Sequence, residues 1–307
     1  MAARPLPLLI LPPTMREERR MTAHRPDLTD SPPVPVYVLS DSTGISAETM
    51  ASALLLQFPA VTFERHVLPF ITTVDEARAV VERIDADSRG PAQPLVFMTV
   101  VDETVRAELR RCAVPTIDFV GDHMPVIEKA LGRHGDHRIA ALHGTGDQRR
   151  YNRRMAAVEF AIEHDDGQSL RALEKADLVL IAPSRCGKTP TSMFLALQHG
   201  LFVANYPLID EDLEVDDLPR PLTELRDRCF GLVSSPQRLH EVRSERRPGS
   251  RYASEQQVVW ELTRAQRMYR RHTIPFVDTS TRSVEEIATI ILQKFPRAGS
   301  STDKDVS

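Results

Sequence analysis

At 307 residues the chain is long enough for two domains of ordinary size, each with a buried core. Hydrophobic residues make up 41% and charged residues 27%, and no apolar run approaches the roughly 20 residues that a membrane-spanning helix needs. The formal net charge of -4 lacks the basic excess of proteins that bind nucleic acids by neutralising phosphates. We therefore expect neither a membrane-spanning protein nor one that binds nucleic acid.

The two ends of the chain and its cysteines bear on where the protein works. Residues 1–35 are rich in Pro, Arg and Thr and cannot bury enough apolar surface to offset the entropy of ordering, so we expect them, and the tail at 299–307, to be disordered. Cys112, Cys186 and Cys229 lie far apart and fit neither a disulfide framework nor paired metal-ligand spacing. This predicts reduced thiols in a cytoplasmic protein.

The first half of the chain alternates predicted strands and helices, which favours a mostly parallel sheet. In the first helix we assign the apolar face to Met50, Ala51, Leu54, Leu55 and Phe58. Between about residues 121 and 154 the periodicity weakens, which predicts a connector. The predicted elements, in chain order, are a strand at 36–39, a helix ending before Pro59, a strand near 61–68, a helix from 75 to about 84 and a strand at 95–100.

The second half repeats this alternation. Ser283 with Glu286, and Ser254 with Gln257, form helix-start patterns. The predicted elements are a helix at 151–164, a strand at 176–181, a helix at 191–199, strands at 202–206 and 274–278, and helices beginning near 254 and 283. The predicted fold class is therefore α/β: an N-terminal α/β domain with its connector at 36–150, then a P-loop kinase-like domain at 151–298 with a mostly parallel sheet.

The loop at residues 182–189 stands between a predicted strand and a predicted helix, where backbone N–H groups can hold phosphate oxygens. Gly187 allows close approach of the backbone, Lys188 reaches the terminal phosphates, and the Thr189 hydroxyl ligates Mg²⁺. Lys188 and Arg185 are the candidate catalytic residues here, because both can stabilise transferred charge. The predicted nucleotide-binding residues are Ala182, Pro183, Ser184, Arg185, Cys186, Gly187, Lys188 and Thr189.

One residue departs from the phosphate-loop pattern G-x-x-x-x-G-K-[ST], because Ala182 stands where the first glycine belongs. A bare G-K-[ST] also turns up by composition in on the order of one in ten chains of this length. The alternative is an ordinary turn that links a strand to a helix. The position of the loop between those two elements favours phosphate binding.

Two acidic sites are further candidates. Asp41, in the polar loop after the first strand, is a candidate base that orients an attacking hydroxyl, although that loop also fits a plain turn and helix cap. Asp165 and Asp166 are candidate Mg²⁺ ligands, because acids at a helix C-terminus oppose the macrodipole and suggest another use. A solvated helix end is the alternative.

Three other groups carry weaker expectations. A group of four arginines, the Arg cluster, either recognises a phosphorylated partner or forms a solvated face. His134 and His137 lie three apart without a nearby third ligand, so we expect no metal site there. Cys186 precedes a predicted helix N-terminus, which would stabilise its thiolate, so its alkylation is expected to inhibit nucleotide binding. The Arg cluster comprises Arg243, Arg246, Arg247 and Arg251.

Several of these stretches resemble the bacterial phosphoenolpyruvate synthase regulatory proteins, within the wider group that regulates pyruvate, phosphate and pyruvate, water dikinases. The likeness covers nearly everything from residue 36 to residue 295, and the Cys186–Gly187 pair is more similar to the synthase regulators than to the phosphate-dikinase regulators. The stretches that carry it are residues 184–192 (SRCGKTPTS), 204–207 (ANYP), 40–44 (SDSTG), 164–167 (HDDG), 245–247 (ERR), 250–254 (SRYAS) and 283–288 (SVEEIA).

The resemblance implies a bifunctional regulator. Proteins of that family are ADP-dependent serine/threonine kinases that phosphorylate a threonine near the phosphohistidine of their dikinase and inactivate it. They reverse this with inorganic phosphate and release pyrophosphate. The implied partner is phosphoenolpyruvate synthase, and the implied ligands are ADP, Mg²⁺ and inorganic phosphate.

Two other functions stay open on the sequence. One is an ATP-dependent small-molecule kinase that uses the same loop, and the other is a non-catalytic adaptor whose loop, altered at Ala182, binds nothing. The sequence also permits a homodimer without predicting the oligomeric state.

Overall fold

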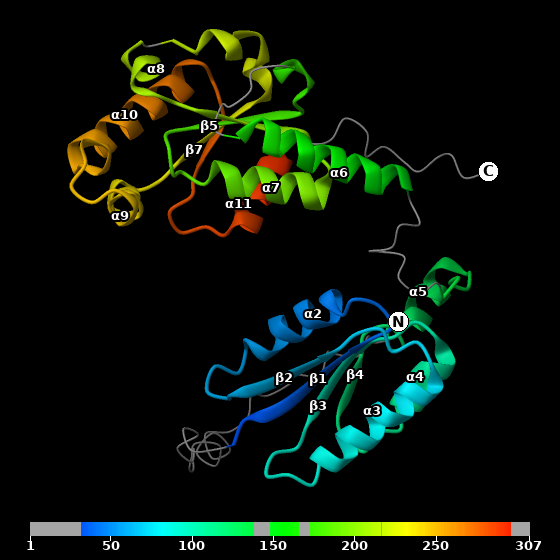
Figure 1. Cartoon of the computed structure of the whole chain (residues 1–307). Coiled ribbons are helices and arrows are strands. Elements are labelled where there is room, and N and C mark those ends of the chain that lie inside the picture. The colour runs from blue at the N-terminus through cyan, green and yellow to red at the C-terminus, as the bar shows by residue number, and fades with distance from the viewer. Residues whose placement is uncertain (1–31, 138–147, 166–171, 216, 296–307) are drawn as a thin grey trace, which may run out of the picture. The chain divides into compact units, whose positions relative to one another are not determined.

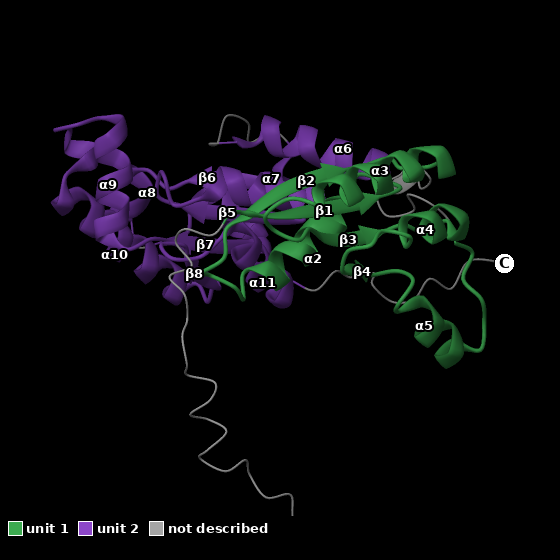
Figure 2. Ribbon diagram, turned by 90° about the horizontal axis from the view of Figure 1, so that it is seen from below, with its two compact units in different colours: residues 1–144 green, residues 145–307 purple. Residues whose placement is uncertain are grey.

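The computed structural model describes residues 32–137, 148–165, 172–215 and 217–295. The chain divides into two compact units, residues 1–144 and 145–307, which Figure 2 shows in different colours and which are described separately below. The segments expected to be disordered lie outside the described residues, except that the first strand already begins at Val34.

The first unit is a four-stranded, all-parallel sheet in the order β2-β1-β3-β4. Helix α2 packs on one face, against Val36, Val38 and Phe97, while α3 and α4 cover the other face, over Tyr37, Leu39 and Met98 (Figure 1). Its elements are β1 (Val34–Ser40), α2 (Ile45–Leu55), β2 (Phe63–Leu68), α3 (Val74–Asp87), β3 (Leu95–Thr99), α4 (Glu103–Leu109), β4 (Thr116–Asp118) and α5 (Met124–Leu131).

The second unit is built around another all-parallel sheet, in the order β6-β5-β7-β8. It begins with α6 (Gln148–Glu163), so the expected domain boundary after residue 150 falls within the first turn of that helix. The sheet and its helices are β5 (Leu178–Ala182), α7 (Lys188–His199), β6 (Val203–Pro207), α8 (Asp210–Glu214), β7 (Cys229–Val233), α9 (Pro236–Arg246), α10 (Glu255–Arg271), β8 (Phe276–Asp278) and α11 (Val284–Lys294). The described part of this unit also contains the 3₁₀ helices η3 (Leu173–Lys175), η4 (Arg220–Arg228) and η5 (Arg251–Ala253).

Helices lie on both faces of this second sheet. Neighbouring residues on a strand face opposite sides, and in β7 the ring of Phe230 meets Phe295, just after α11, whereas Gly231 lies under the ring of Tyr269 on α10. Figure 1 shows α6, α7 and α11 packed together. Every residue of β5 is buried, as expected for a central strand covered on both sides. The α/β fold class, with its mostly parallel sheets, is therefore confirmed.

The strand order places a switch point in each sheet. From β1 the chain moves to β2 on one side and then to β3 on the other, and from β5 it moves to β6 and then to β7 in the same way. Ligands of open α/β sheets bind at the carboxyl ends of the strands at such a point. The loop at residues 182–189 follows β5 and lies at this position in the second unit.

The predicted apolar face of α2 is only partly confirmed, because Ala51 and Leu55 are buried and the other three predicted residues are not. The structure buries Ala47, Ala51 and Leu55, one stripe at four-residue spacing, and leaves Met50 44%, Leu54 47% and Phe58 58% exposed. Small side chains let the helix lie close to the sheet, so the alanine stripe, rather than the larger residues, faces the core. The apolar pattern therefore found two of the three buried positions of α2, missed Ala47 and added three exposed residues.

The predicted connector after residue 121 contains a helix, α5, which the sequence analysis missed. None of its residues is buried, and Val126, Ile127 and Leu131 are exposed, so the segment lacks a core-facing period that sequence reading could detect. Residues 138–147 of the predicted connector lie outside the described residues, and its last part, from Gln148, belongs to α6.

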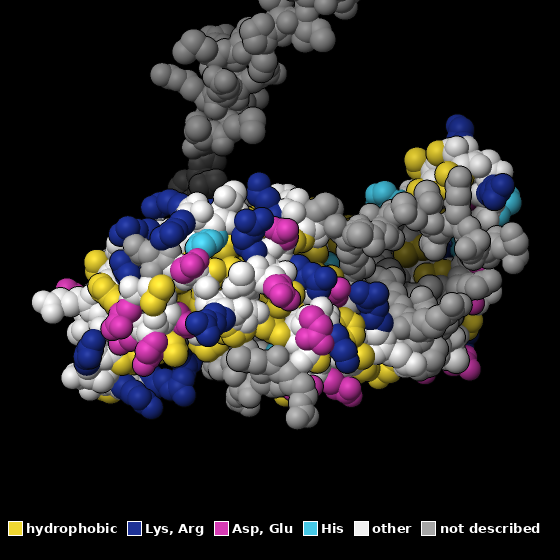
Figure 3. Space-filling model, turned by 90° about the horizontal axis from the view of Figure 1, so that it is seen from above, with side chains coloured by type: hydrophobic (Ala, Val, Ile, Leu, Met, Phe, Trp, Pro, Cys, Tyr) yellow, Lys and Arg dark blue, Asp and Glu magenta, His cyan; other side chains and the backbone are white. Residues whose placement is uncertain are grey.

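The surface carries charges of both signs. Figure 3 shows Lys and Arg side chains interspersed with Asp and Glu side chains on the face that it displays. Within the described part of the chain, no helix is both long enough and apolar enough to span a bilayer.

Candidate phosphate and nucleotide site

The 182–189 loop starts on the last residue of β5 and ends in the first turn of α7. Ala182 is fully buried and pairs with Pro207 in the ladder between β5 and β6, so it has strand conformation and needs no glycine. Gly187, with φ of 89°, is the N-cap of α7 in the left-handed conformation, and here a side chain would be strained. The departure from the phosphate-loop pattern thus falls where an alanine fits.

The carbonyl groups of this loop are held by donors from several elements. The Ser184 oxygen accepts from the Arg243 guanidinium at 3.0 Å, and Thr279 Oγ1 lies 3.2 Å from the Cys186 oxygen. The Gly187 oxygen accepts from Thr191 Oγ1 at 2.8 Å. In a trans peptide the N–H of the next residue points the opposite way, so the N–H groups of residues 185, 187 and 188 are directed away from these donors.

Lys188 is the first residue of α7, and its side chain is only 3% exposed. Its Nζ donates to the carbonyl oxygens of Ala182 at 3.1 Å and Pro183 at 3.2 Å. The ammonium group is therefore held over the start of the loop. An arriving phosphate oxygen could replace one of these carbonyl acceptors.

Arg185 is exposed, and its φ of 72° places it in the left-handed region, which costs a non-glycine residue about 1 kcal/mol. Strained residues of this kind cluster at functional sites. Arg185 lines a pocket of about 200 Å³ together with Arg238 and Arg282. The apolar part of that lining includes Leu239, Val284 and Ile287.

Thr189 and Asp165, both predicted Mg²⁺ ligands, lie side by side. Thr189 Oγ1 donates to Asp165 Oδ1 at 2.8 Å, and Asn205 Nδ2 donates to the same oxygen at 2.6 Å. Asn205 Nδ2 also lies 3.0 Å from Ser192 Oγ. The other predicted ligand, Asp166, lies outside the described residues.

This group of residues fits a magnesium ion. The buried Asn205 Oδ1 has no hydrogen-bond partner, and it adds an amide oxygen to the Asp165 carboxylate and the Thr189 hydroxyl. Mg²⁺ takes oxygen ligands and is usually held by one or two carboxylates plus substrate phosphates. Asn205 was not among the predicted site residues, although an amide inside the short buried strand β6 is itself a signal.

Asp41 belongs to the first unit, at the carboxyl end of β1. It is 4% exposed, and its Oδ2 accepts from the Val101 N–H at 2.6 Å. Burial raises the pKa of the Asp41 carboxyl, and hydrogen bonds from the backbone of Val101 and Asp102 oppose the rise. A carboxyl group with a raised pKa is suited to accept a proton.

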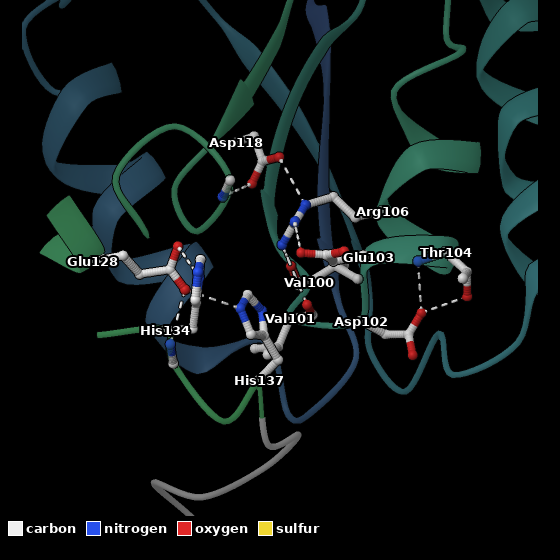
Figure 4. Close-up of polar contacts among 12 residues, drawn as sticks. Val100, Val101, Asp102, Glu103, Thr104, Arg106, Asp118, Glu128, His134 and His137 are labelled. Atoms are coloured by element: carbon white, nitrogen blue, oxygen red, sulfur yellow. Dashed lines mark hydrogen bonds and ion pairs between the residues drawn. The ribbon is translucent and has the colours of Figure 1, made fainter. Parts of the chain in front are cut away.

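The loop that supports Asp41 is itself anchored. Arg106 donates to the carbonyl oxygens of Val100 at 3.4 Å and Val101 at 3.2 Å, and its Nε lies 3.8 Å from the buried Asp118 carboxylate (Figure 4). These contacts fix the turn between β3 and α4. The Val101 N–H is therefore held in place to donate to Asp41.

The two histidines discussed above have an acidic neighbour that their spacing did not reveal. Glu128 Oε1 lies 3.3 Å from His137 Nε2, and Glu128 Oε2 lies 3.6 Å from His134 Nδ1 (Figure 4). The Gly135 N–H also donates to Glu128 and is the largest cause that lowers the pKa of this carboxyl. Within the described residues, no three His, Cys, Asp or Glu side chains are grouped so as to hold a metal ion.

The expectation that Cys186 is a stabilised thiolate is wrong. Its side chain is 1% exposed, and burial raises the pKa of the thiol to about 12, an effect that the nearby Lys188 only partly offsets. The sequence placed the residue correctly next to a helix N-terminus. It could not reveal that the sulfur points into the core, where the charged form is disfavoured.

We therefore expect Cys186 to resist alkylation in the folded protein. At pH 8 a thiol of this pKa is ionised in roughly one molecule in 10⁴. Timed reaction with iodoacetamide, followed by peptide mass spectrometry, should leave Cys186 unmodified until denaturant is added. Equal rates in the native and denatured protein would contradict its burial.

The Arg cluster is also only partly as predicted. Arg243 is fully buried and is unavailable to a phosphorylated partner, whereas Arg246, Arg247 and Arg251 are exposed. An arginine is rarely buried unless it is paired, so sequence reading assigned Arg243 to the surface.

Fold and site together define a two-unit α/β protein whose second sheet carries a kinase-like succession of strand, loop and helix. The chain belongs to the kinase/pyrophosphorylase family, whose model matches residues 36–292. The family recognised in the sequence is thereby confirmed.

Curated relatives match over most of their length. A Bordetella avium protein is 44% identical over 262 residues, which is 84% of this chain and 95% of the relative. A Neisseria meningitidis serogroup C protein is 44% identical over 264 residues, which is 86% of this chain and 97% of the relative. Both carry the name "Putative phosphoenolpyruvate synthase regulatory protein".

Proposed function

We propose that this protein is a cytoplasmic, ADP-dependent serine/threonine kinase that inactivates phosphoenolpyruvate synthase and that reactivates it by phosphate-dependent dephosphorylation, releasing pyrophosphate. Membership of the kinase/pyrophosphorylase family and the names of the relatives support the target and the two reactions. The three cysteines, all free, support a reducing compartment.

The observation that carries the proposal is the arrangement of the 182–189 loop. Its carbonyl oxygens accept hydrogen bonds from Arg243 and Thr191, and Thr279 Oγ1 lies close to a third. The amide N–H groups that follow these carbonyls are therefore directed away from those donors. Those amides, the positive end of the α7 dipole and the Lys188 ammonium together favour a polyphosphate. The contact between Thr191 and Gly187 occurs at the start of many helices, but a turn that merely linked a strand to a helix would not need the bond from Arg243, 59 positions away.

We assign the base and ribose of ADP to the neighbouring pocket. Its volume of about 200 Å³ is below the roughly 300–1,000 Å³ of pockets that enclose whole ligands, so it suits one part of a nucleotide. Val284 and Ile287 offer an apolar surface to a base, and the guanidinium of Arg238 can stack on it. Arg185 lines the same pocket and can reach the phosphates.

In the forward reaction the target threonine oxygen forms a bond to the β-phosphorus of ADP, the bond to the bridging oxygen breaks, and AMP leaves. Lys188 and Arg185 hold the transferred phosphoryl oxygens. The hydroxyl proton passes to a base, for which Asp41 of the first unit is the candidate. Asp165, Thr189 and Asn205 would hold Mg²⁺, which supplies neutralising charge at the phosphates. In the second reaction an oxygen of inorganic phosphate forms a bond to the phosphorus of phosphothreonine, the bond from that phosphorus to the threonine oxygen breaks, and the threonine hydroxyl and pyrophosphate are released.

A donor comparison tests the function. Purified phosphoenolpyruvate synthase, phosphorylated beforehand by phosphoenolpyruvate, is incubated with the protein, Mg²⁺ and either ADP or ATP, and phosphothreonine is mapped by mass spectrometry. We expect modification with ADP, and pyrophosphate release when phosphate is then added. Transfer from ATP alone to a metabolite would favour the small-molecule kinase, and a silent ADP titration would favour the adaptor.

A further inference from the structure

Arg243, on α9, has a fully buried side chain, although it carries a permanent charge. Its guanidinium group has five N–H donors, and the structure gives it five hydrogen bonds. Two of them reach the Glu261 carboxylate, at 3.0 and 2.6 Å. Two more reach the Ser184 carbonyl oxygen, at 3.3 and 3.0 Å, and one reaches the Tyr252 carbonyl oxygen at 3.0 Å.

Tyr252 makes a second side-chain contact with Ser184. Its hydroxyl lies 2.9 Å from Ser184 Oγ, and the Arg243 guanidinium lies over its ring at 4.3 Å from the centroid. Glu261, on α10, is further held by Gln257 Nε2 at 3.1 Å. Side chains from α9 and η5 therefore contact Ser184, a single residue of the 182–189 loop, and Glu261 on α10 holds Arg243 in place.

We propose that Arg243, Glu261 and Tyr252 form a clamp that sets the direction of the phosphate-binding amides, with Arg243 as the positioning residue. This rests on the proposed function. Fixing the Ser184 carbonyl fixes the plane of the next peptide, and hence the direction of the Arg185 N–H. It also holds the chain in place as it enters the left-handed conformation of Arg185.

The clamp acts on the loop rather than on substrate. The donors of Arg243 already have protein acceptors, and its side chain has no exposed surface, so it is not a catalytic residue. The pocket lining includes Arg185, Arg238 and Leu239 but not the three clamp residues. Loss of the clamp should therefore weaken contacts to phosphate and spare contacts to the base.

The test uses a double variant, Arg243→Met with Glu261→Met, in the full chain. Arg243→Met alone would leave the Glu261 carboxylate buried without its cation, which is strongly destabilising, whereas replacing both partners of a buried pair is often tolerated. The matched control is Arg246→Met, at an exposed position on the same helix. Tyr252→Phe removes only the hydroxyl contact and serves as a second, milder variant.

Two readouts separate positioning from general loosening. Hydrogen exchange of peptides covering residues 184–188 should accelerate about tenfold in the double variant and about threefold in Tyr252→Phe, with no change in the control. By calorimetry with Mg²⁺, binding of ADP and of pyrophosphate should weaken about tenfold in the double variant, while binding of adenosine stays as in the parent.

Several outcomes would overturn the clamp. The clamp is ruled out if both variants exchange their amide hydrogens and bind pyrophosphate as the parent does. It is also ruled out if the affinities for adenosine and for pyrophosphate fall equally, because that indicates general loosening of the protein. If the double variant does not fold, the Tyr252→Phe result decides. If the parent protein itself binds no ADP, the proposed function fails, while the exchange data still decide whether the clamp orders the loop.

Discussion

Replacing Lys188 by alanine is expected to lower the rate of phosphoryl transfer by about 10²- to 10³-fold, the usual effect of removing a donor that stabilises transition-state charge. Its Nζ lies 3.1 Å and 3.2 Å from the carbonyl oxygens of Ala182 and Pro183, and so beside the loop amides. The charge on the transferred group grows where this ammonium can reach it. The fold should persist, because the Ala182 carbonyl oxygen still accepts from the Leu208 N–H at 2.9 Å.

Steady-state transfer from ADP to the target, measured as phosphothreonine formed per unit time, checks this result. Lys175→Ala provides the control, since Lys175 is an exposed lysine at the end of η3. Thermal melts of both variants establish that they are folded. A Lys188→Ala protein that retained more than a tenth of the parent rate would remove this lysine from the proposed mechanism.

The loop was predictable because each of its signals is local. Strand β5 is a run of apolar residues, α7 begins directly after Gly187, and a glycine ends that helix. The capping box at Ser283 and Glu286 is likewise confirmed, with both of its hydrogen bonds present. Signals that lie within one element and its caps can be read without knowing what packs on it.

Other elements escaped detection because their signal is short or depends on packing. The strand β4 has only three residues, too few to show a period, and α5 has no buried face. In α2 the stripe that packs on the sheet is small, so larger exposed residues such as Leu54 dominated the pattern. Composition cannot tell which of two apolar stripes a sheet will cover.

The support of the site depends on contacts that are distant in sequence. Arg243 reaches Ser184 across 59 positions, and Asn205 reaches Asp165 across 40. Nothing in the sequence around an isolated arginine or asparagine indicates such a distant partner. The residues expected to touch ligand could therefore be proposed from a motif, whereas those that orient them became visible only in the fold.

Asp165→Asn is expected to raise the Mg²⁺ concentration needed for half-maximal transfer by roughly 10- to 100-fold, the range seen when groups around a metal are changed. Asp165 Oδ1 is the shared acceptor for Thr189 Oγ1 and Asn205 Nδ2, so it organises the oxygen atoms that we assign to the ion. Asparagine keeps an oxygen there but removes the negative charge that draws a divalent cation.

Initial rates measured against Mg²⁺ concentration at fixed ADP test this assignment. Saturating Mg²⁺ should restore much of the Asp165→Asn rate, because the substitution weakens binding of the ion and leaves the phosphoryl contacts of Lys188 intact. Lys188→Ala should gain nothing from added Mg²⁺, so the two variants separate the two roles. Glu163→Gln changes an exposed carboxylate on the same helix end and should follow the parent curve. A Mg²⁺ dependence of Asp165→Asn that coincides with that of the parent would mean that the ion is held elsewhere.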